Sequence, residues 1–168
     1  MFNRYKKEYL MFNDDIQGTA ATVLAGLYGA MKVQGLTPEA LKHQRIVVAG
    51  AGSAGSGVIL TIRNAMHKRY GLTKEEASSR FFIVDKDGLI SAHRPTLAKM
   101  EEEFYDLSSF AVPDAAMEGK SLLETVKTVK PNIIIGAESI IDHVTLITLC
   151  VQACQRVAVC SVRRFLRP

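Results

Sequence analysis

The spacing of apolar residues predicts a chain of alternating helices and short buried strands. Between Ile16 and Met31, large apolar side chains recur at intervals of three and four residues, as on the buried face of a helix. Alanines and glycines fill much of this segment, so the predicted helix is thin and another element can pack closely against it. The helix is predicted to end near Gly35. Thr37 is a candidate N-cap for a short helix that runs through Leu41.

Three apolar, β-branched runs predict strands that are buried on both faces. They are Arg45–Ala49, Phe81–Val84 and Ile133–Ile135, and each is followed by a glycine or an aspartate. The intervening pattern predicts helices over Ser53–Tyr70 and Ser121–Val129, and a capping box at Thr73 that opens a brief helix. This alternation favours an α/β fold with a doubly wound, Rossmann-like parallel sheet that is incomplete in its C-terminal part.

The segment after Gly136 has no clear period. Residues 140–162 are rich in Val, Ile, Leu, Thr and Cys, which leaves open a helix followed by a strand. All three cysteines gather here, and none stands elsewhere to pair with them, so the sequence favours a reducing compartment over a disulfide framework. The longest apolar tract, around Val144–Val151, is too short to span a bilayer, and no membrane association is expected.

Positive charge is concentrated at the C-terminus. The formal net charge of +4 comes from the arginines that follow the last acidic residue, Asp142, namely Arg156, Arg163, Arg164 and Arg167. The rest of the chain is neutral, which gives little support to nucleic-acid binding. The N-terminus mixes basic and acidic residues without an apolar core, so no targeting signal is recognisable, and the cytoplasm and the mitochondrial matrix both fit.

A glycine-rich loop stands between the first predicted strand and the helix that follows it. Gly50, Gly52, Ser53, Ala54 and Gly55 belong to a G-x-G-x-x-G pattern. In such a loop the first glycine permits a tight turn, the second lets the backbone approach a pyrophosphate, and the third lets the helix lie close to the strand. The helix N-terminus adds free N–H groups and a partial positive charge. The placement favours a dinucleotide site over a purely structural turn.

Asp85 ends the next predicted strand, where a carboxylate can hydrogen-bond a ribose hydroxyl. It lies further past Gly55 than the usual spacing of about 20 residues, and the inserted segment Gly71–Ser79 accounts for the excess. An alternative, compatible with the first, is that Asp85 forms the turn that follows it.

The choice between NAD and NADP depends on charge beside the ribose. Lys86 follows Asp85 and could hold a 2′-phosphate, whereas Asp87 and the acidic run Glu101–Glu103 would repel one. The sequence therefore favours NAD, with NADP left open.

Asn13–Thr19 reads NDDIQGT, with two adjacent aspartates at a helix start. From the residues alone, Asp14 and Asp15 are most simply capping or dipole-neutralising groups. The longer stretch FNDDIQGTA, together with GAGSAG at 50–55, GLTKEEA at 71–77 and VDKDGLI at 84–90, resembles the malic enzymes. The resemblance covers about residues 2–136.

The resemblance implies the oxidative decarboxylation of malate to pyruvate and carbon dioxide, with NAD or NADP and a divalent Mn²⁺ or Mg²⁺. A metal in this role polarises the ketone, which is work for a hard, oxygen-ligated ion. By resemblance Asp15 is a metal ligand, and Asp14 is a catalytic-site residue that orients and tunes the family's catalytic lysine. Malate or pyruvate as the small-molecule substrate, and a homo-oligomeric state, are implied in the same way.

Several of the family's catalytic groups have no counterpart here: the two other metal carboxylates, the tyrosine, the lysine and the malate-binding arginine. We therefore expect a truncated malic enzyme that binds NAD and is doubtful as a complete catalyst. One alternative is a non-catalytic Rossmann-like module that associates with a full-length paralogue. Another is an active malic enzyme whose remaining parts belong to a longer natural chain. The expected organisation is an N-terminal segment (1–36), a dinucleotide-binding domain (37–136) and a divergent tail (137–168).

The remaining polar candidates carry little signal. Arg94 follows a short predicted strand, GLI at 88–90, and is expected in a solvated loop, although a contact with the cofactor stays open. The four histidines are scattered and are expected at the surface; they are His43, His67, His93 and His143.

Overall fold

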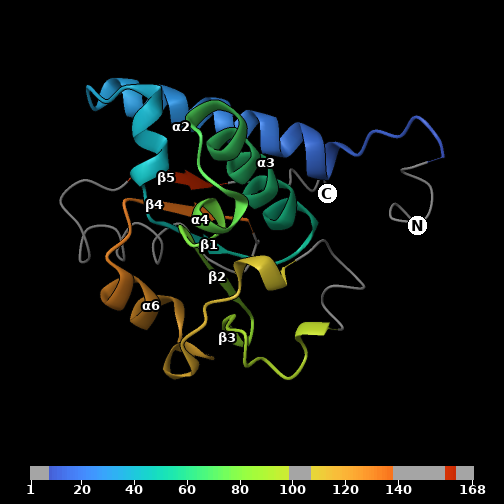
Figure 1. Ribbon diagram of the computed structural model, residues 1–168, viewed down its shortest axis with the longest axis vertical. Coiled ribbons are helices and arrows are strands. Elements are labelled where there is room, and N and C mark those ends of the chain that lie inside the picture. The colour runs from blue at the N-terminus through green and yellow to red at the C-terminus, as the bar shows by residue number, and fades with distance from the viewer. Residues whose placement is uncertain (1–7, 99–106, 138–157, 162–168) are drawn as a thin grey trace, which may run out of the picture.

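The computed structural model of the chain describes residues 8–98, 107–137 and 158–161 (Figure 1). Strands β1 (Ile46–Ala49), β2 (Phe81–Asp85), β4 (Ile133–Gly136) and β5 (Ala158–Ser161) run parallel, while β3 (Gly88–Leu89) is antiparallel to β2. The strand order is β3-β2-β1-β4-β5. This confirms the doubly wound α/β sheet.

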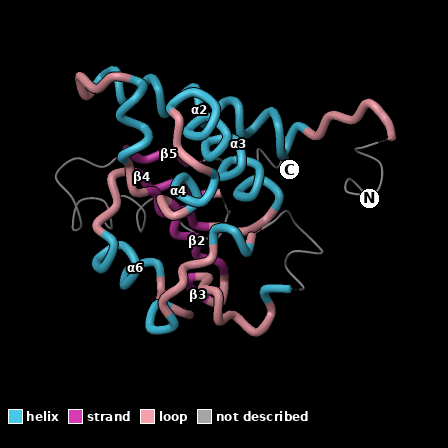
Figure 2. The backbone as a smooth tube through the Cα atoms, in the orientation of Figure 1, coloured by secondary structure: helices cyan, strands magenta, loops and turns pink. Residues whose placement is uncertain are grey.

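Helices cover both faces of the sheet (Figure 2). Helices α2 (Thr19–Val33) and α3 (Ser53–Tyr70) lie over one face together with α4 (Lys74–Ser78), and α6 (Leu122–Val129) lies over the other. Short helical turns complete the chain: η1 (Asp14–Gly18), η2 (Pro38–His43), η3 (Ser108–Phe110) and η4 (Ala115–Met117). No helix in the described part is both long and apolar enough to cross a membrane.

The apolar periodicity of the first long helix is confirmed. Ala20, Val23, Leu27 and Met31 are its buried residues, and they join a core cluster with α3 and with alternate residues of β1, β2 and β4. The partner of α2 is α3, and the two helices are also joined where Tyr70 Oη donates to Tyr28 Oη at 3.1 Å. Burial, followed by this hydrogen bond, raises the pKa of Tyr70 to about 12.

The predicted end of α3 and the predicted capping box at Thr73 are confirmed, and the predicted cap at Thr37 is wrong. Gly71 ends α3 in the left-handed region with φ +76°, and Thr73 forms its capping box. Ser121 forms a second capping box, which was not predicted. Thr37 precedes η2 but makes no side-chain cap hydrogen bond. The third amide of η2, Ala40 N, donates instead to the backbone oxygen Thr37 O at 3.0 Å, so the threonine hydroxyl does not receive that hydrogen bond.

Two further strands complete the sheet. β3 confirms the short GLI strand expected at 88–90, and it pairs Val84 with Leu89 and Asp85 with Gly88. β5 supplies the strand that was left open after Gly136 and lies parallel to β4. The helix considered before it, together with Cys150 and Cys154, falls within residues 138–157, which are outside the described part. Arg163, Arg164 and Arg167 also lie outside it.

Candidate functional site: the carboxyl edge of the sheet

The glycine loop lies where β1 ends and α3 begins. Gly50 has φ +117°, a conformation that side chains rarely adopt, and its N–H donates to Val84 O at 2.8 Å. A Cβ on Gly55 would stand 2.0 Å from Gly50 O, so only glycine lets the helix start this close to the strand end. A Cβ on Gly52 would meet nothing within 4 Å, which leaves open space beside that backbone.

Three amides at the start of α3 precede the first intrahelical hydrogen bond. That bond runs from Ser56 N to Gly52 O at 2.9 Å, and the cap residue Gly52 offers no side chain to the amides of Ser53, Ala54 and Gly55. The loop itself is held from behind, because the buried Ser56 Oγ donates to Ala51 O at 3.2 Å. Amides that have no acceptor among the described residues, next to open space, suit a phosphate group.

Asp85 lies beside this loop at the end of β2, since Val84 pairs with Ala49 at the end of β1. Asp85 Oδ1 accepts a hydrogen bond from Asp87 N at 2.8 Å, so the aspartate does shape the turn. Its two oxygens also accept from Arg94 Nη1 at 3.1 and 2.9 Å. A role toward ribose stays a prediction, and Lys86 beside it is exposed.

The expectation of a solvated loop for Arg94 is wrong. Arg94 is 7% exposed, and in addition to Asp85 it donates to Glu118 through Nε and to Gly88 O and Leu89 O through Nη2. Every nitrogen of the guanidinium thus has an acceptor. Glu118 stands 24 residues further along the chain, so no local pattern marks it as the partner.

Charge and hydrogen bonds stabilise this cluster against the cost of burial. Burial by itself would raise the pKa of Glu118, but hydrogen bonds from Ser91 and the Arg94 guanidinium hold it below its usual value. For Arg94, burial favours the neutral form, yet Glu118 and Asp85 together raise its pKa. Glu118 and Arg94 therefore face each other as a carboxylate and a guanidinium cation in the folded protein at neutral pH.

The acidic segment forms η1, a π-helical turn that precedes α2 directly. Its cap position is Asn13, which makes no side-chain cap hydrogen bond; instead Asn13 N donates to Gln17 Oε1 at 2.7 Å. Asp14 is exposed, and a Cβ on Gly18 would lie 2.0 Å from Asp14 Oδ1, so the glycine of the motif makes room for that carboxylate. The side chain of Asp15 falls outside the described part.

The acidic turn η1 packs against helix α3. A Cβ on Gly57 of α3 would stand 2.6 Å from Ile16 O, so η1 packs on α3 one turn beyond the glycine loop. Gly57 was not singled out in the sequence. A signal was present, because a glycine inside a helix costs about 1 kcal/mol relative to alanine and is retained where close packing needs it.

The described residues do not by themselves fit a divalent metal. Within the described ranges, no three His, Cys, Asp or Glu side chains come together as a metal site. Ions such as Mg²⁺ take about six oxygen ligands, and Asp14 is a single exposed carboxylate. The metal role of Asp15 stays a prediction.

Two histidines match the surface expectation and one departs from it. His43 and His93 are exposed, whereas His67 is half-buried and its Nδ1 donates to Leu72 O at 2.7 Å, next to the end of α3. His143 lies outside the described residues.

A parallel sheet in which a glycine-rich loop joins the end of the first strand to the N-terminus of a helix is the arrangement of a Rossmann-type nucleotide-binding domain. Residues 16–156 match the family model described as "Malic enzyme, NAD binding domain". The chain belongs to the malic enzyme family. The match continues past Gly136, where the recognisable motifs end.

Similar proteins agree with this assignment. The chain is 39% identical over 137 residues to "NAD-dependent malic enzyme 2, mitochondrial" of Arabidopsis thaliana, covering 82% of this chain and 22% of that protein. It is 41% identical over 137 residues to "NAD-dependent malic enzyme" of Proteus mirabilis, covering 81% and 24%. The crystal structure of Entamoeba histolytica malic enzyme has a similar fold, with TM-score 0.55, 21% identity and coverage of 74% and 23%. The chain thus spans less than a quarter of these relatives.

Proposed function

We propose that this chain is the dinucleotide-binding part of a malic enzyme and binds NAD at the carboxyl edge of its sheet. The observation that carries the proposal is the open space at Gly52 in front of three amides without intrahelical acceptors. Family membership and the NAD-dependent relatives support the choice of ligand. Turnover of malate to pyruvate and carbon dioxide belongs to the whole enzyme, of which the chain covers less than a quarter of the length.

The residues of the loop divide the work of binding. The amides of Ser53, Ala54 and Gly55 donate to the pyrophosphate, and the positive end of α3 favours its charge. Gly50 and Gly55 set the backbone that places those amides, while Asp85, oriented by Arg94, accepts from a ribose hydroxyl. NAD, when bound, supplies the acceptor for a hydride.

A buried acidic cluster at the ribose position favours NAD over NADP. All nitrogens of Arg94 are already occupied by Asp85, Glu118 and backbone oxygens, so its guanidinium is not available to a 2′-phosphate. The exposed Lys86 is the remaining cation beside Asp85. We expect a Lys86→Glu variant to weaken residual NADP binding more than NAD binding.

Calorimetric titration with NAD tests the proposal. The wild-type chain should bind, and Gly52→Ala should weaken binding at least about tenfold, since a methyl group then fills the space the pyrophosphate needs. Gly26→Ala is a matched control, because a Cβ there also meets nothing within 4 Å but lies on α2, away from the loop. Equal NAD affinity for the wild type and Gly52→Ala would refute the site and favour a role through association.

A further inference from the structure

The turn between β2 and β3 packs closely against the segment that follows η4. A Cβ on Gly88 would stand 2.2 Å from Gly119 O, so only a residue without a side chain fits there. Beside this contact, Leu89 N donates to Lys120 O at 2.8 Å and Gly119 N donates to Leu89 O at 3.0 Å. The segment after η4 therefore holds a fixed place beside the end of β2.

Glu118 is the residue of this segment that reaches the ion-pair cluster. One of its carboxylate oxygens, Oε1, accepts from Arg94 Nε, and the other, Oε2, accepts from Ser91 N at 2.8 Å. The side chain is 24% exposed, so most of it is shielded from water, where interactions between charged groups are stronger. Both of its oxygens are thus held, one by a guanidinium and one by a backbone amide.

Arg94 connects Glu118 to Asp85. Its guanidinium has five N–H donors, and five hydrogen bonds leave it: Nη1 donates to both oxygens of Asp85, Nη2 donates to two backbone oxygens, and Nε donates to Glu118. Because the guanidinium is planar, holding Nε and Nη2 also fixes the direction of Nη1. The position of Glu118 therefore helps to set the position of the donor to Asp85.

The carboxylate of Asp85 has one acceptor position to spare. A carboxylate can accept about four hydrogen bonds. From the described residues, Oδ1 accepts two, from Asp87 N and Arg94 Nη1, and Oδ2 accepts one, from the same Nη1. The side chain is only 11% exposed, so the remaining position, on Oδ2, points in a fixed direction.

We propose that Glu118 is a positioning residue for the adenosine ribose of NAD, and that it acts through Arg94 to direct Oδ2 of Asp85 at the ribose 2′-hydroxyl. The inference rests on the proposed NAD site, in which the acidic residue at this strand end accepts from that hydroxyl. Glu118 makes no contact with the cofactor in this role. Its effect is on geometry, because a binding group works only when its supporting residues hold it within about 0.5 Å of the productive position.

The test compares NAD with 2′-deoxy-NAD, which lacks only the 2′-hydroxyl of the adenosine ribose. Calorimetric titration of the whole chain gives both dissociation constants, and their ratio measures how strongly the site recognises that hydroxyl. We expect the wild type to bind NAD at least about tenfold more tightly, as for a hydrogen bond to a charged acceptor. Glu118→Gln keeps the shape and removes the charge, and it should lower the ratio to about threefold, because its hydrogen bond to Arg94 becomes about half as strong.

Two further variants test the route from Glu118 to the ribose. Asp85→Ala removes the acceptor and should bring the ratio to about one. Arg94→Lys keeps a positive charge without the planar fork, and it should lower the ratio at least as far as Glu118→Gln does. Adding Glu118→Gln to Arg94→Lys should then change nothing more, since Glu118 acts only through the guanidinium. A further fall of the ratio in the double variant would contradict this route.

The ratio separates positioning from folding. A variant that is partly unfolded loses apparent affinity for both ligands by the same factor, so its ratio is unaffected. Glu39→Gln is the matched control, because Glu39 is an exposed glutamate on η2, which leads into the start of β1 at the other edge of the sheet. It should keep the wild-type ratio.

Three results would overturn the proposal, and each identifies a different error. An unchanged ratio in Glu118→Gln, with discrimination in the wild type, refutes only the positioning role and leaves the NAD site in place. A wild-type ratio near one shows that NAD binds without a hydrogen bond from its 2′-hydroxyl to Asp85. Binding of neither ligand by the wild type refutes the NAD site itself, and the positioning role with it.

Discussion

The glycine loop and the acidic end of β2 are neighbours at the carboxyl edge of the sheet, but different forces hold them. The loop is fixed by backbone geometry within six residues, with Gly55 against Gly50 O and Gly50 at positive φ. The acidic end is fixed by an ion-pair cluster in which Arg94 joins Asp85 to Glu118. A backbone-defined site can be recognised in a sequence, whereas a cluster of distant charged residues cannot.

The largest effect is expected where the loop permits no side chain. Gly55→Val places carbon on a backbone oxygen that cannot move away, so the free energy of unfolding should fall by about 3 kcal/mol. Gly52→Ala has open space and should change stability by less than about 1 kcal/mol. Urea unfolding of both variants measures the difference, and equal losses would mean that the loop is not held by this contact.

The cluster should be the next most sensitive region. Arg94→Met leaves two carboxylates near each other without their shared cation, and we expect a loss of about 2 kcal/mol because Glu118 retains some access to solvent. Lys127→Met on α6 is a control for losing an exposed charge and should have an effect within about 0.5 kcal/mol. Thermal unfolding distinguishes them, and comparable midpoints would show that the cluster is dispensable.

Acidification should affect the cluster before the loop. The pKa of Glu118 is lowered in the folded protein, so its contribution is present above its ordinary pKa of 4.5 and is lost as the pH falls through the folded value. Glu118→Gln should accordingly flatten the decline in stability below about pH 4.5. Urea midpoints measured from neutral to acidic pH give the slope, and parallel curves for both proteins would argue against this assignment.

The smallest effect compares two threonines that precede short helices. Thr73 accepts a hydrogen bond from Glu76 N at 3.1 Å, whereas Thr37 makes no such cap bond. Thr73→Ala should cost about 1 kcal/mol and Thr37→Ala less than about 0.5 kcal/mol. Equal costs in urea unfolding would place the stabilisation outside the hydrogen bond.

Local signals explain what could be predicted from the sequence. The buried strands, the start of α3, the Gly71 stop and the capping box at Thr73 all depend on residues within a few positions of one another. The Arg94 cluster and the contact of Gly57 with Ile16 depend on segments that meet only after folding. The roles of Asp14 and Asp15 come from resemblance alone, since one carboxylate is exposed and the other is not described.

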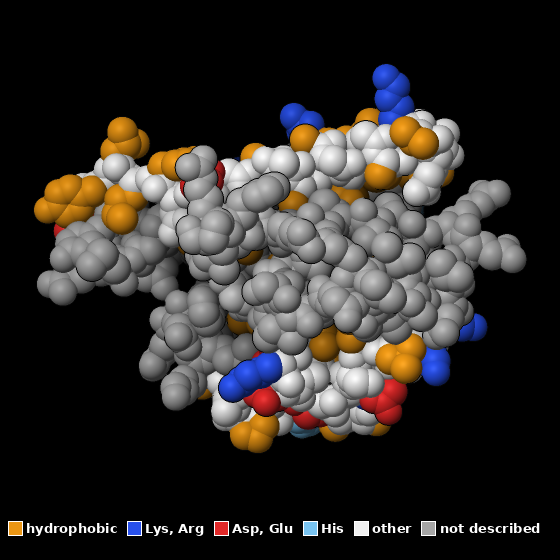
Figure 3. Space-filling view, turned by 180° about the vertical axis from the view of Figure 1, so that it is seen from behind, with side chains coloured by type: hydrophobic (Ala, Val, Ile, Leu, Met, Phe, Trp, Pro, Cys, Tyr) orange, Lys and Arg blue, Asp and Glu red, His pale blue; other side chains and the backbone are white. Residues whose placement is uncertain are grey.

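The segment before η1 carries several exposed apolar side chains. Large hydrophobic side chains gather on the segment before η1, where Tyr9, Leu10 and Phe12 are 63%, 107% and 71% exposed, and this projecting end is visible in Figure 3. The segment contributes little to the core and leads directly into the acidic turn. Exposed apolar patches of this kind are typical of surfaces that contact another segment or another molecule.

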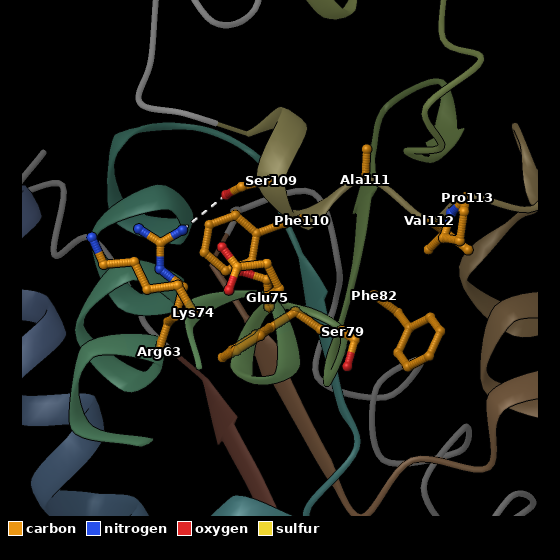
Figure 4. A pocket seen from close by; sticks show the side chains of 12 residues that line it. Arg63, Lys74, Glu75, Ser79, Phe82, Ser109, Phe110, Ala111, Val112 and Pro113 are labelled. Carbon is orange, nitrogen blue, oxygen red and sulfur yellow. Dashed lines mark hydrogen bonds between the residues drawn. The ribbon is translucent and has the colours of Figure 1, made fainter. Parts of the chain in front are cut away.

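Helix α3 connects three features of the molecule along its length. Its first turn carries the amides that we propose bind a phosphate, Gly57 packs against the acidic turn, and Arg63 lines a cavity near the start of β2 (Figure 4). With a rise of about 1.5 Å per residue, Gly57 lies about 6 Å and Arg63 about 15 Å from Ser53 along the helix axis. A residue inserted into this helix would move every residue after it by about 1.5 Å along the axis and rotate it by about 100°. The length of α3 is therefore as constrained as its composition.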